Sequence, residues 1–115
     1  MSTIPPIQPI ADDVCVAGQL EPDAMSWAAQ KGFRSVVNNR PDHEGGAGQP
    51  TSQAIETAAH AAGLVYVYLP VAPSFQTAQE IASFAQLLHT LPRPILMFCR
   101  SGTRSGKLYR AATGG

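Results

Sequence analysis

The stretch that decides the fold is PILMFCRSGTRSGKLYRAA, residues 94–112. Its apolar run, residues 95–98, predicts a strand, and a helix is expected from about residue 105 to 112. Between them lies CRSGTRS, a tight loop that begins at Cys99 and contains one glycine. A strand, a glycine-containing loop and a helix N-terminus form a backbone arrangement that binds anions. Cys99 is therefore expected at the carboxyl end of a strand, where open α/β sheets place their ligand sites.

The rest of the chain alternates short apolar runs with helical stretches, which predicts an α/β fold. We expect a single domain over residues 1–115 with a core from about 7 to 112, built on a central, mostly parallel sheet of four to five strands flanked by helices. The run LVYVYL is apolar throughout, so we expect its strand to be buried on both faces. The expected strands are 14–16, 33–37, 64–69 and 95–98. The expected helices lie between Pro22 and Gly32, at 52–62, after a capping box of Thr77 and Glu80, and at 105–112.

The composition restricts the function classes. Eight basic and eight acidic side chains give a net charge of zero, which excludes a uniformly basic nucleic-acid-binding protein. The two cysteines, Cys15 and Cys99, are far apart and have no histidine at metal-ligand spacing, so we expect no metal site and no cofactor. No apolar run approaches the length of a membrane span. We therefore expect a cytoplasmic protein with reduced thiols and no membrane or nucleic-acid partner.

The zero net charge conceals an uneven distribution. Residues 1–92 hold three basic side chains and all eight carboxylates, whereas residues 93–115 hold five basic side chains and no acidic one. The positive charge is thus concentrated in the segment that contains Cys99. A neutral domain with one local positive region suits a small anionic substrate.

The loop after Cys99 has the residue types of an anion-binding cradle. A helix dipole and a curl of backbone amides would stabilise both a bound anion and the thiolate of Cys99. A thiolate that faces an anion is a nucleophile. The alternative is a buried structural cysteine followed by a basic, hydroxyl-rich helix cap. We expect Cys99 and Arg104 to be catalytic, and the substrate-binding candidates are Arg100, Ser101, Gly102, Thr103 and Ser105.

The chain resembles a known family at several motifs. These are CRSGTRS, AGQL at residues 17–20, NNRPD at 38–42, GQPTS at 48–52 and the AGL before the third expected strand. Together they look like the phosphatase-like domain of β-lactamase-hydrolase-like proteins, over about residues 7–111. The resemblance implies a protein-tyrosine-phosphatase-like fold, fusion to sulfide-oxidation enzymes, and either phosphatase or sulfur-transfer activity.

Three features of the sequence bear on the choice between these activities. A tyrosine phosphatase loop reads His-Cys-x5-Arg, whereas here Phe98 precedes the cysteine, Ser105 takes the arginine position, and Cys-x4-Arg with Arg104 is similar to the rhodanese loop. Residues 57–79 hold no carboxylate, so the loop after the third strand offers no general acid. Asp42, His43 and Glu44 remain as possible acids, because their loop leaves the carboxyl end of the second strand.

We therefore expect a sulfurtransferase that carries sulfur from thiosulfate or a persulfide donor as a Cys99 persulfide. The first alternative is a phosphatase that acts on a phosphate ester through a cysteinyl-phosphate on Cys99. The second is a non-catalytic anion-binding module whose fused or separately encoded partner is a sulfide-oxidation enzyme. Arg40 and Asp42 are candidates to line the pocket, and their alternative role is an internal ion pair or turn that stabilises the long loop.

Overall fold

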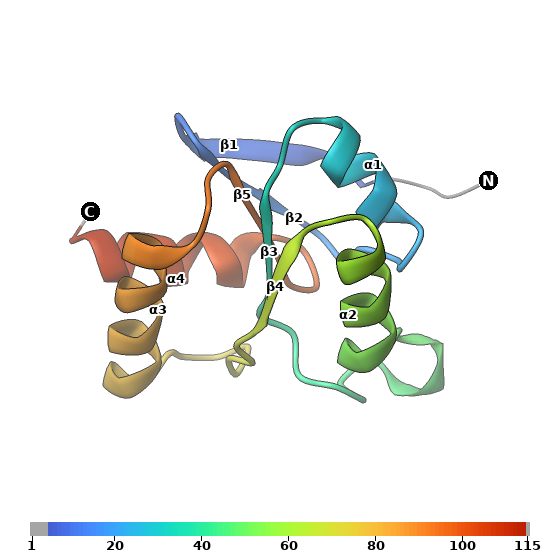
Figure 1. Ribbon diagram of the computed structural model, residues 1–115. Coiled ribbons are helices and arrows are strands. Elements are labelled where there is room, and N and C mark those ends of the chain that lie inside the picture. Colours follow the sequence, from blue (N-terminus) through green and yellow to red (C-terminus); the bar gives the residue numbers. More distant parts are fainter. Residues whose placement is uncertain (1–4, 115) are drawn as a thin grey trace.

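The computed structural model describes residues 5–114 and has one five-stranded sheet with strand order β1-β2-β5-β3-β4. β1 runs antiparallel to β2, and the other neighbours are parallel. This confirms the expected α/β fold with a mostly parallel central sheet (Figure 1). The strands are β1 (Ile7–Ala11), β2 (Val14–Ala17), β3 (Ser35–Asn38), β4 (Val65–Tyr68) and β5 (Ile95–Phe98).

Two helices cover each face of the sheet (Figure 1). On one side lie α1 (Ala24–Gln30) and α2 (Ser52–Ala61), and on the other lie α3 (Ala78–Thr90) and α4 (Thr103–Thr113). The helices end or begin close to the expected residues. The capping box of α3 is confirmed, because the Thr77 hydroxyl accepts from the Glu80 amide while the Glu80 carboxylate accepts from the Thr77 amide. None of the helices in residues 5–114 has the length and apolar content of a bilayer crossing.

The central strand β5 organises both halves of the core. All four of its side chains are buried, and they alternate between the faces. Leu96 and Phe98 join the cluster under α1 and α2, whereas Ile95 and Met97 join the cluster under α3 and α4. A strand that is apolar at every position is therefore explained by its place in the middle of the sheet.

The expectation that the third predicted strand is buried on both faces was wrong. This strand is β4, which lies at an edge of the sheet, and Val65 and Tyr68 are 41% and 38% exposed. Its apolar run has the same composition as a central strand, but the strand order leaves it with β3 as its only partner strand among the described residues.

β1 was not among the strands expected from the sequence. Proline-rich segments read as loops, since proline cannot donate to a sheet ladder. Here Pro9 is accommodated because β1 is the other edge strand and its pairing with β2 shifts register between Pro9 and Ala11. Because one side of an edge strand has no partner strand, the N–H that proline lacks costs the sheet no hydrogen bond when it would point to that side.

The register brings three strand ends to one edge. Ala17 of β2 and Asn38 of β3 both lie beside Phe98 of β5. Two backbone bonds extend the pairing by one residue, from the Cys99 amide to the Ala17 carbonyl at 3.3 Å and from the Asn39 amide to the Phe98 carbonyl at 2.9 Å. The loops after β2, β3 and β5 therefore meet around Cys99.

The core under α3 gives a stability prediction. Phe84 of α3 is fully buried, whereas Phe75 is 63% exposed. Replacing Phe84 by alanine leaves a cavity and should lower the free energy of unfolding by about 3–5 kcal/mol. The matched change Phe75→Ala should alter it by less than about 0.5 kcal/mol. Urea unfolding of both variants at unchanged m-value checks this, and equal losses would contradict the packing described.

Candidate active site

Cys99 follows β5 directly and is buried, with 1% of the residue exposed. The chain then turns sharply at Gly102, which has φ of +93° and caps α4. Glycine adopts this left-handed conformation at no steric cost. The turn brings the Gly102 amide to the Cys99 Sγ, to which it donates a hydrogen bond at 3.1 Å. The glycine of CRSGTRS is therefore needed to close the loop around the sulfur.

The end of β2 holds the outer side of this loop. The Gln19 amide donates to the Arg100 carbonyl at 3.3 Å, and a Cβ on Gly18 would lie 3.1 Å from the same oxygen. Position 18 thus has little room for a side chain. The AGQL motif, which the sequence offered only as part of a resemblance, has a physical role in packing against the Cys99 loop.

Backbone amides at the start of α4 favour the Cys99 thiolate. Burial alone raises the pKa of Cys99, but hydrogen bonding from Ser105, Ser101 and Gly102 at the start of α4 outweighs it. The net effect lowers the pKa of Cys99 below the ordinary value for a thiol. The pKa of Cys15 is raised, because burial acts there without such donors. The positive end of the α4 dipole acts in the same direction as the amides.

A buried pair fixes the Ser105 side chain. The Ser105 hydroxyl donates to Asn39 Oδ1 at 2.8 Å, and Asn39 Nδ2 donates to the Leu69 carbonyl at 2.9 Å. Both side chains are fully buried. A hydroxyl has a single proton, and the structure gives that of Ser105 to Asn39. The pair therefore ties the start of α4, beside the thiol, to the ends of β3 and β4.

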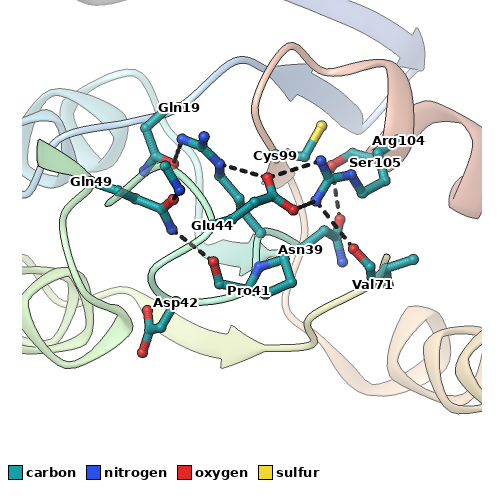
Figure 2. Close-up of polar contacts among 12 residues, drawn as sticks. Gln19, Asn39, Pro41, Asp42, Glu44, Gln49, Val71, Cys99, Arg104 and Ser105 are labelled. Atoms are coloured by element: carbon teal, nitrogen blue, oxygen red, sulfur yellow. Dashed lines mark hydrogen bonds and ion pairs between the residues drawn. The ribbon is translucent and has the colours of Figure 1, made fainter. Parts of the chain in front are cut away.

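Arg104 is held by a carboxylate from the loop after β3. Its two terminal nitrogens donate to the two oxygens of Glu44 at 3.0 and 3.1 Å, and Nη1 also donates to the Val71 carbonyl at 3.1 Å. Arg40 Nε donates to Glu44 Oε1 at 2.9 Å. The Glu44 carboxylate is thus paired with both guanidiniums, and Figure 2 shows it facing that of Arg104. We call Arg40, Glu44 and Arg104 the arginine clamp.

The clamp keeps Glu44 ionised. Burial raises the pKa of Glu44, but the hydrogen bonds and charges of Arg104 and Arg40 lower it by more. The Glu44 side chain is 21% exposed and that of Arg104 is 8% exposed. A bidentate pair of this kind fixes the orientation of the guanidinium as well as its charge.

Two adjoining clefts open at this edge of the sheet. The smaller, of about 200 Å³, contains Cys99, and the larger, of about 480 Å³, contains the clamp. Pro73, Arg100 and Arg104 line both. The remaining lining residues are Ser101, Thr103 and Lys107 in the first and Arg40, Glu44 and Gly45 in the second. An anion that enters beside Cys99 therefore meets three cationic side chains.

Most of the predicted site residues lie at the two clefts, but Asp42 does not. Cys99, Arg104 and the residues 100–105 lie together, with Gly102 and Ser105 against the sulfur and the others at the cleft. Arg40 lines the adjoining cleft. Asp42 instead accepts a hydrogen bond from the Ser52 amide at 2.7 Å, at the start of α2, and Figure 2 shows its carboxylate turned away from Cys99. Its role in the structure is therefore the alternative that the sequence allowed, a stabiliser of the long loop.

Sequence reasoning missed three contributors to this site. Asn39 orients Ser105, Gln19 Oε1 accepts from Arg40 at 3.1 Å, and Lys107 lines the cleft one helical turn after Thr103. Asn39 carried a usable signal, because it follows an expected strand directly. Among residues 5–114 no cluster of three or more His, Cys, Asp or Glu side chains has the geometry of a metal site.

The chain is similar to known proteins over most of its length. The family described as "Beta-lactamase hydrolase-like protein, phosphatase-like domain" matches residues 7–115. The chain belongs to this family. Among its relatives, the beta-lactamase hydrolase-like protein of Xylella fastidiosa is 36% identical over 100 residues, which are 87% of this chain and 23% of that protein. The chain thus spans about a quarter of the relative's length.

Solved structures confirm the protein-tyrosine-phosphatase-like fold. A candidate phosphatase of Neisseria meningitidis is 27% identical, with a TM-score of 0.80 over 88% of this chain and 71% of that one. A Pseudomonas aeruginosa protein solved in complex with phosphotyrosine has a TM-score of 0.68 at 16% identity, over 95% of this chain and 66% of that one. The second likeness shows the fold alone. The resemblance drawn from CRSGTRS and its companion motifs is confirmed.

The thiol environment gives a pH prediction. In a Cys15→Ser variant, alkylation of Cys99 by iodoacetamide should reach half its maximal rate below the pH of about 8.5 expected for a free thiol. The reason is the lowered pKa of Cys99. The Cys99→Ser variant, which retains only Cys15, should titrate above that pH, because the pKa of Cys15 is raised. The initial rate against pH for both variants is the measurement.

The same pKa difference links Cys99 to stability. The thiolate's contribution is complete above the unfolded-state pKa of about 8.5 and is lost as the pH falls through the lower native pKa. The gap in unfolding free energy between the chain and Cys99→Ser should therefore widen as the pH rises through this interval. A gap that narrows would contradict the hydrogen bonding assigned to the sulfur.

The arginine clamp gives a further stability prediction. Glu44→Gln removes the charge that faces two guanidiniums, one of them buried, and should lower the unfolding free energy by about 1–3 kcal/mol. The control Glu56→Gln disturbs an exposed pair with His60 at 4.0 Å and should change it by less than about 0.5 kcal/mol. Chemical denaturation at pH 7 measures both, and indistinguishable variants would show that the clamp adds no stability.

Proposed function

We propose that the chain is a cysteine-dependent phosphatase domain in which Cys99 is the nucleophile. The observation that carries the proposal is a buried thiol at the start of α4 that accepts a hydrogen bond from the Gly102 amide at 3.1 Å and shares a cleft with Arg100, Arg104 and Lys107. The loop amides stabilise a thiolate, and together with these cations they form a cradle for a tetrahedral anion. The family's phosphatase-like character and the likeness to the Neisseria protein support phosphoryl transfer over the other candidates.

The proposed reaction has two steps. The Cys99 thiolate attacks the phosphorus of a bound phosphate, forms an S–P bond and displaces the leaving oxygen. Water then attacks the cysteinyl-phosphate, and the S–P bond breaks to return the thiolate and release phosphate. Arg104 and the loop amides stabilise the negative charge that develops on the phosphoryl oxygens in both steps. Glu44 holds the Arg104 guanidinium in place for this task.

Sulfur transfer, the first expectation from the sequence, is the second candidate. The Cys-x4-Arg spacing favours it, and so does the ionised state of Glu44, since sulfite leaves thiosulfate as an anion without needing a proton. Cys99 would attack the outer sulfur of thiosulfate, keep it as a persulfide and pass it to a thiol. A sulfide-oxidation enzyme, fused in the longer protein or encoded beside it, is the partner that this candidate implies.

Two assays on one preparation separate the candidates. Hydrolysis of p-nitrophenyl phosphate should be lost in Cys99→Ser and retained in Cys15→Ser. Arg104→Ala should lower kcat by about 10²–10³-fold, because a positioned donor to the transition state contributes that much. Arg93→Ala is the matched control, since Arg93 pairs with Asp13 at 2.9 Å far from the cleft. It removes the same charge and should leave the rate within about twofold.

The second assay is intact mass spectrometry after incubation with thiosulfate. A species one sulfur atom heavier, absent in Cys99→Ser, together with no phosphate hydrolysis, would overturn the phosphatase proposal in favour of sulfur transfer. Absence of both reactions would leave the non-catalytic module. Equal activity of Arg104→Ala and the unaltered chain in either assay would refute the role given to Arg104.

A further inference from the structure

The described lining of the two clefts lacks an uncommitted carboxyl, imidazole or phenol group that could protonate a leaving group. Of the residues that line them in the described part of the chain, Glu44 is the only carboxylate, and there is no Asp, His or Tyr. A general acid must carry its proton before the reaction and be within hydrogen-bond reach of the leaving oxygen. Among the carboxyl, imidazole and phenol groups of residues 5–114, Glu44 alone lines these clefts.

Glu44 is poorly suited to that task. Its two oxygens accept three hydrogen bonds from Arg104 and Arg40, at 2.9 to 3.1 Å, and every one of these donors is a permanently charged guanidinium. Protonation would put a neutral carboxylic acid between two cations and break the clamp. The segment after β4 passes over the cleft at Pro73 and has no titratable side chain between residues 69 and 76.

The same clefts hold more positive charge than one phosphate group needs. Arg104 and Arg40 share the Glu44 carboxylate, but Arg100 and Lys107 make no ion pair among residues 5–114. Both line the cleft that contains Cys99 and both are exposed at its surface. They are placed to receive a second anionic group next to the one on the sulfur.

We propose that the substrates of this site are phosphoanhydrides, which carry a second phosphate next to the one transferred, rather than alkyl or unactivated aryl phosphate monoesters. The inference rests on the phosphatase function proposed above. The Cys99 thiolate forms the S–P bond while the bridging P–O bond breaks, and the electron pair stays on the bridging oxygen, which leaves as the second phosphate.

This leaving group removes the need for an acid. A phosphate with a second pKa of about 6 leaves without a proton at pH 7, whereas a phenolate of pKa about 10 or an alkoxide needs one. Arg100 and Lys107 stabilise the additional negative charge as the bridging oxygen departs. Water then hydrolyses the cysteinyl-phosphate, restores the thiolate and gives its proton to the released phosphate or to solvent.

The experiment compares leaving groups with one preparation, in the presence of a chelator that silences contaminating metal-dependent phosphatases. The probes are inorganic pyrophosphate, p-nitrophenyl phosphate and phenyl phosphate, each with Cys99→Ser as the blank. Pyrophosphate and p-nitrophenyl phosphate should be hydrolysed. Phenyl phosphate should be slower than p-nitrophenyl phosphate by about 10²–10⁴-fold, since a general acid would otherwise supply that factor.

A matched pair of charge variants tests the second-phosphate site. Lys107→Ala should raise the KM for pyrophosphate about tenfold, and by more than it raises the KM for p-nitrophenyl phosphate. Lys31→Ala removes the same charge at the end of α1 and should change neither. Equal effects of Lys107→Ala on both substrates would overturn the assignment of Lys107 to a second phosphate.

The failures can be told apart. If p-nitrophenyl phosphate and phenyl phosphate are turned over at similar rates and pyrophosphate is untouched, a general acid operates and the phosphoanhydride proposal fails while the phosphatase function stands. If none of the three is hydrolysed in a Cys99-dependent way, the phosphatase function fails and this proposal falls with it.

Discussion

The structure depends on the close approach of two backbone segments, the end of β2 and the loop that follows Cys99. The Cys99 amide bonds to the Ala17 carbonyl, and a side chain at position 18 would press on the Arg100 carbonyl. This contact fixes where the loop begins, and Gly102 then fixes how it turns. With both in place the Gly102 amide donates to the Cys99 sulfur, and the residues at the start of α4 lower the pKa of the thiol. The lowered pKa of the Cys99 thiol therefore depends on the packing of the end of β2 against the loop that follows β5.

The parts of the fold that could be predicted from the sequence are those with strong local signals. The helices follow from periodicity and capping residues, and β5 follows from an unbroken apolar run before CRSGTRS. The strand order was beyond such signals, because LVYVYL and ILMF have similar composition and only their neighbours differ. β4 is an edge strand and β5 a central one. The proline-rich segment that contains β1 was likewise compatible with either a loop or an edge strand.

The candidate site shows the same division. Residues 99–105 were predictable because loop and nucleophile are contiguous, so that one short motif contains them. The contributions from 39–44 depend on which way each side chain of a long loop points, and sequence spacing does not encode this. Asp42 and Glu44 are two residues apart, yet one carboxylate serves the start of α2 and the other holds Arg104. This difference between two carboxylates that the sequence offered alike as possible acids follows from the path of the loop, in which His43 adopts φ of +69°.

The two ends of the sheet have different roles: one carries the candidate site and the other carries contacts that join the strand starts. The end that contains Cys99 is formed by loops after β2, β3 and β5, whereas the opposite end contains the Asp13–Arg93 pair and the backbone bonds of Arg34 and Ile95 that join the strand starts. Substitutions that tune recognition fall on the first end and those that adjust thermal robustness can fall on the second. Because the strands separate these two groups of positions, substitutions that change ligand preference at one end need not lower the stability provided at the other.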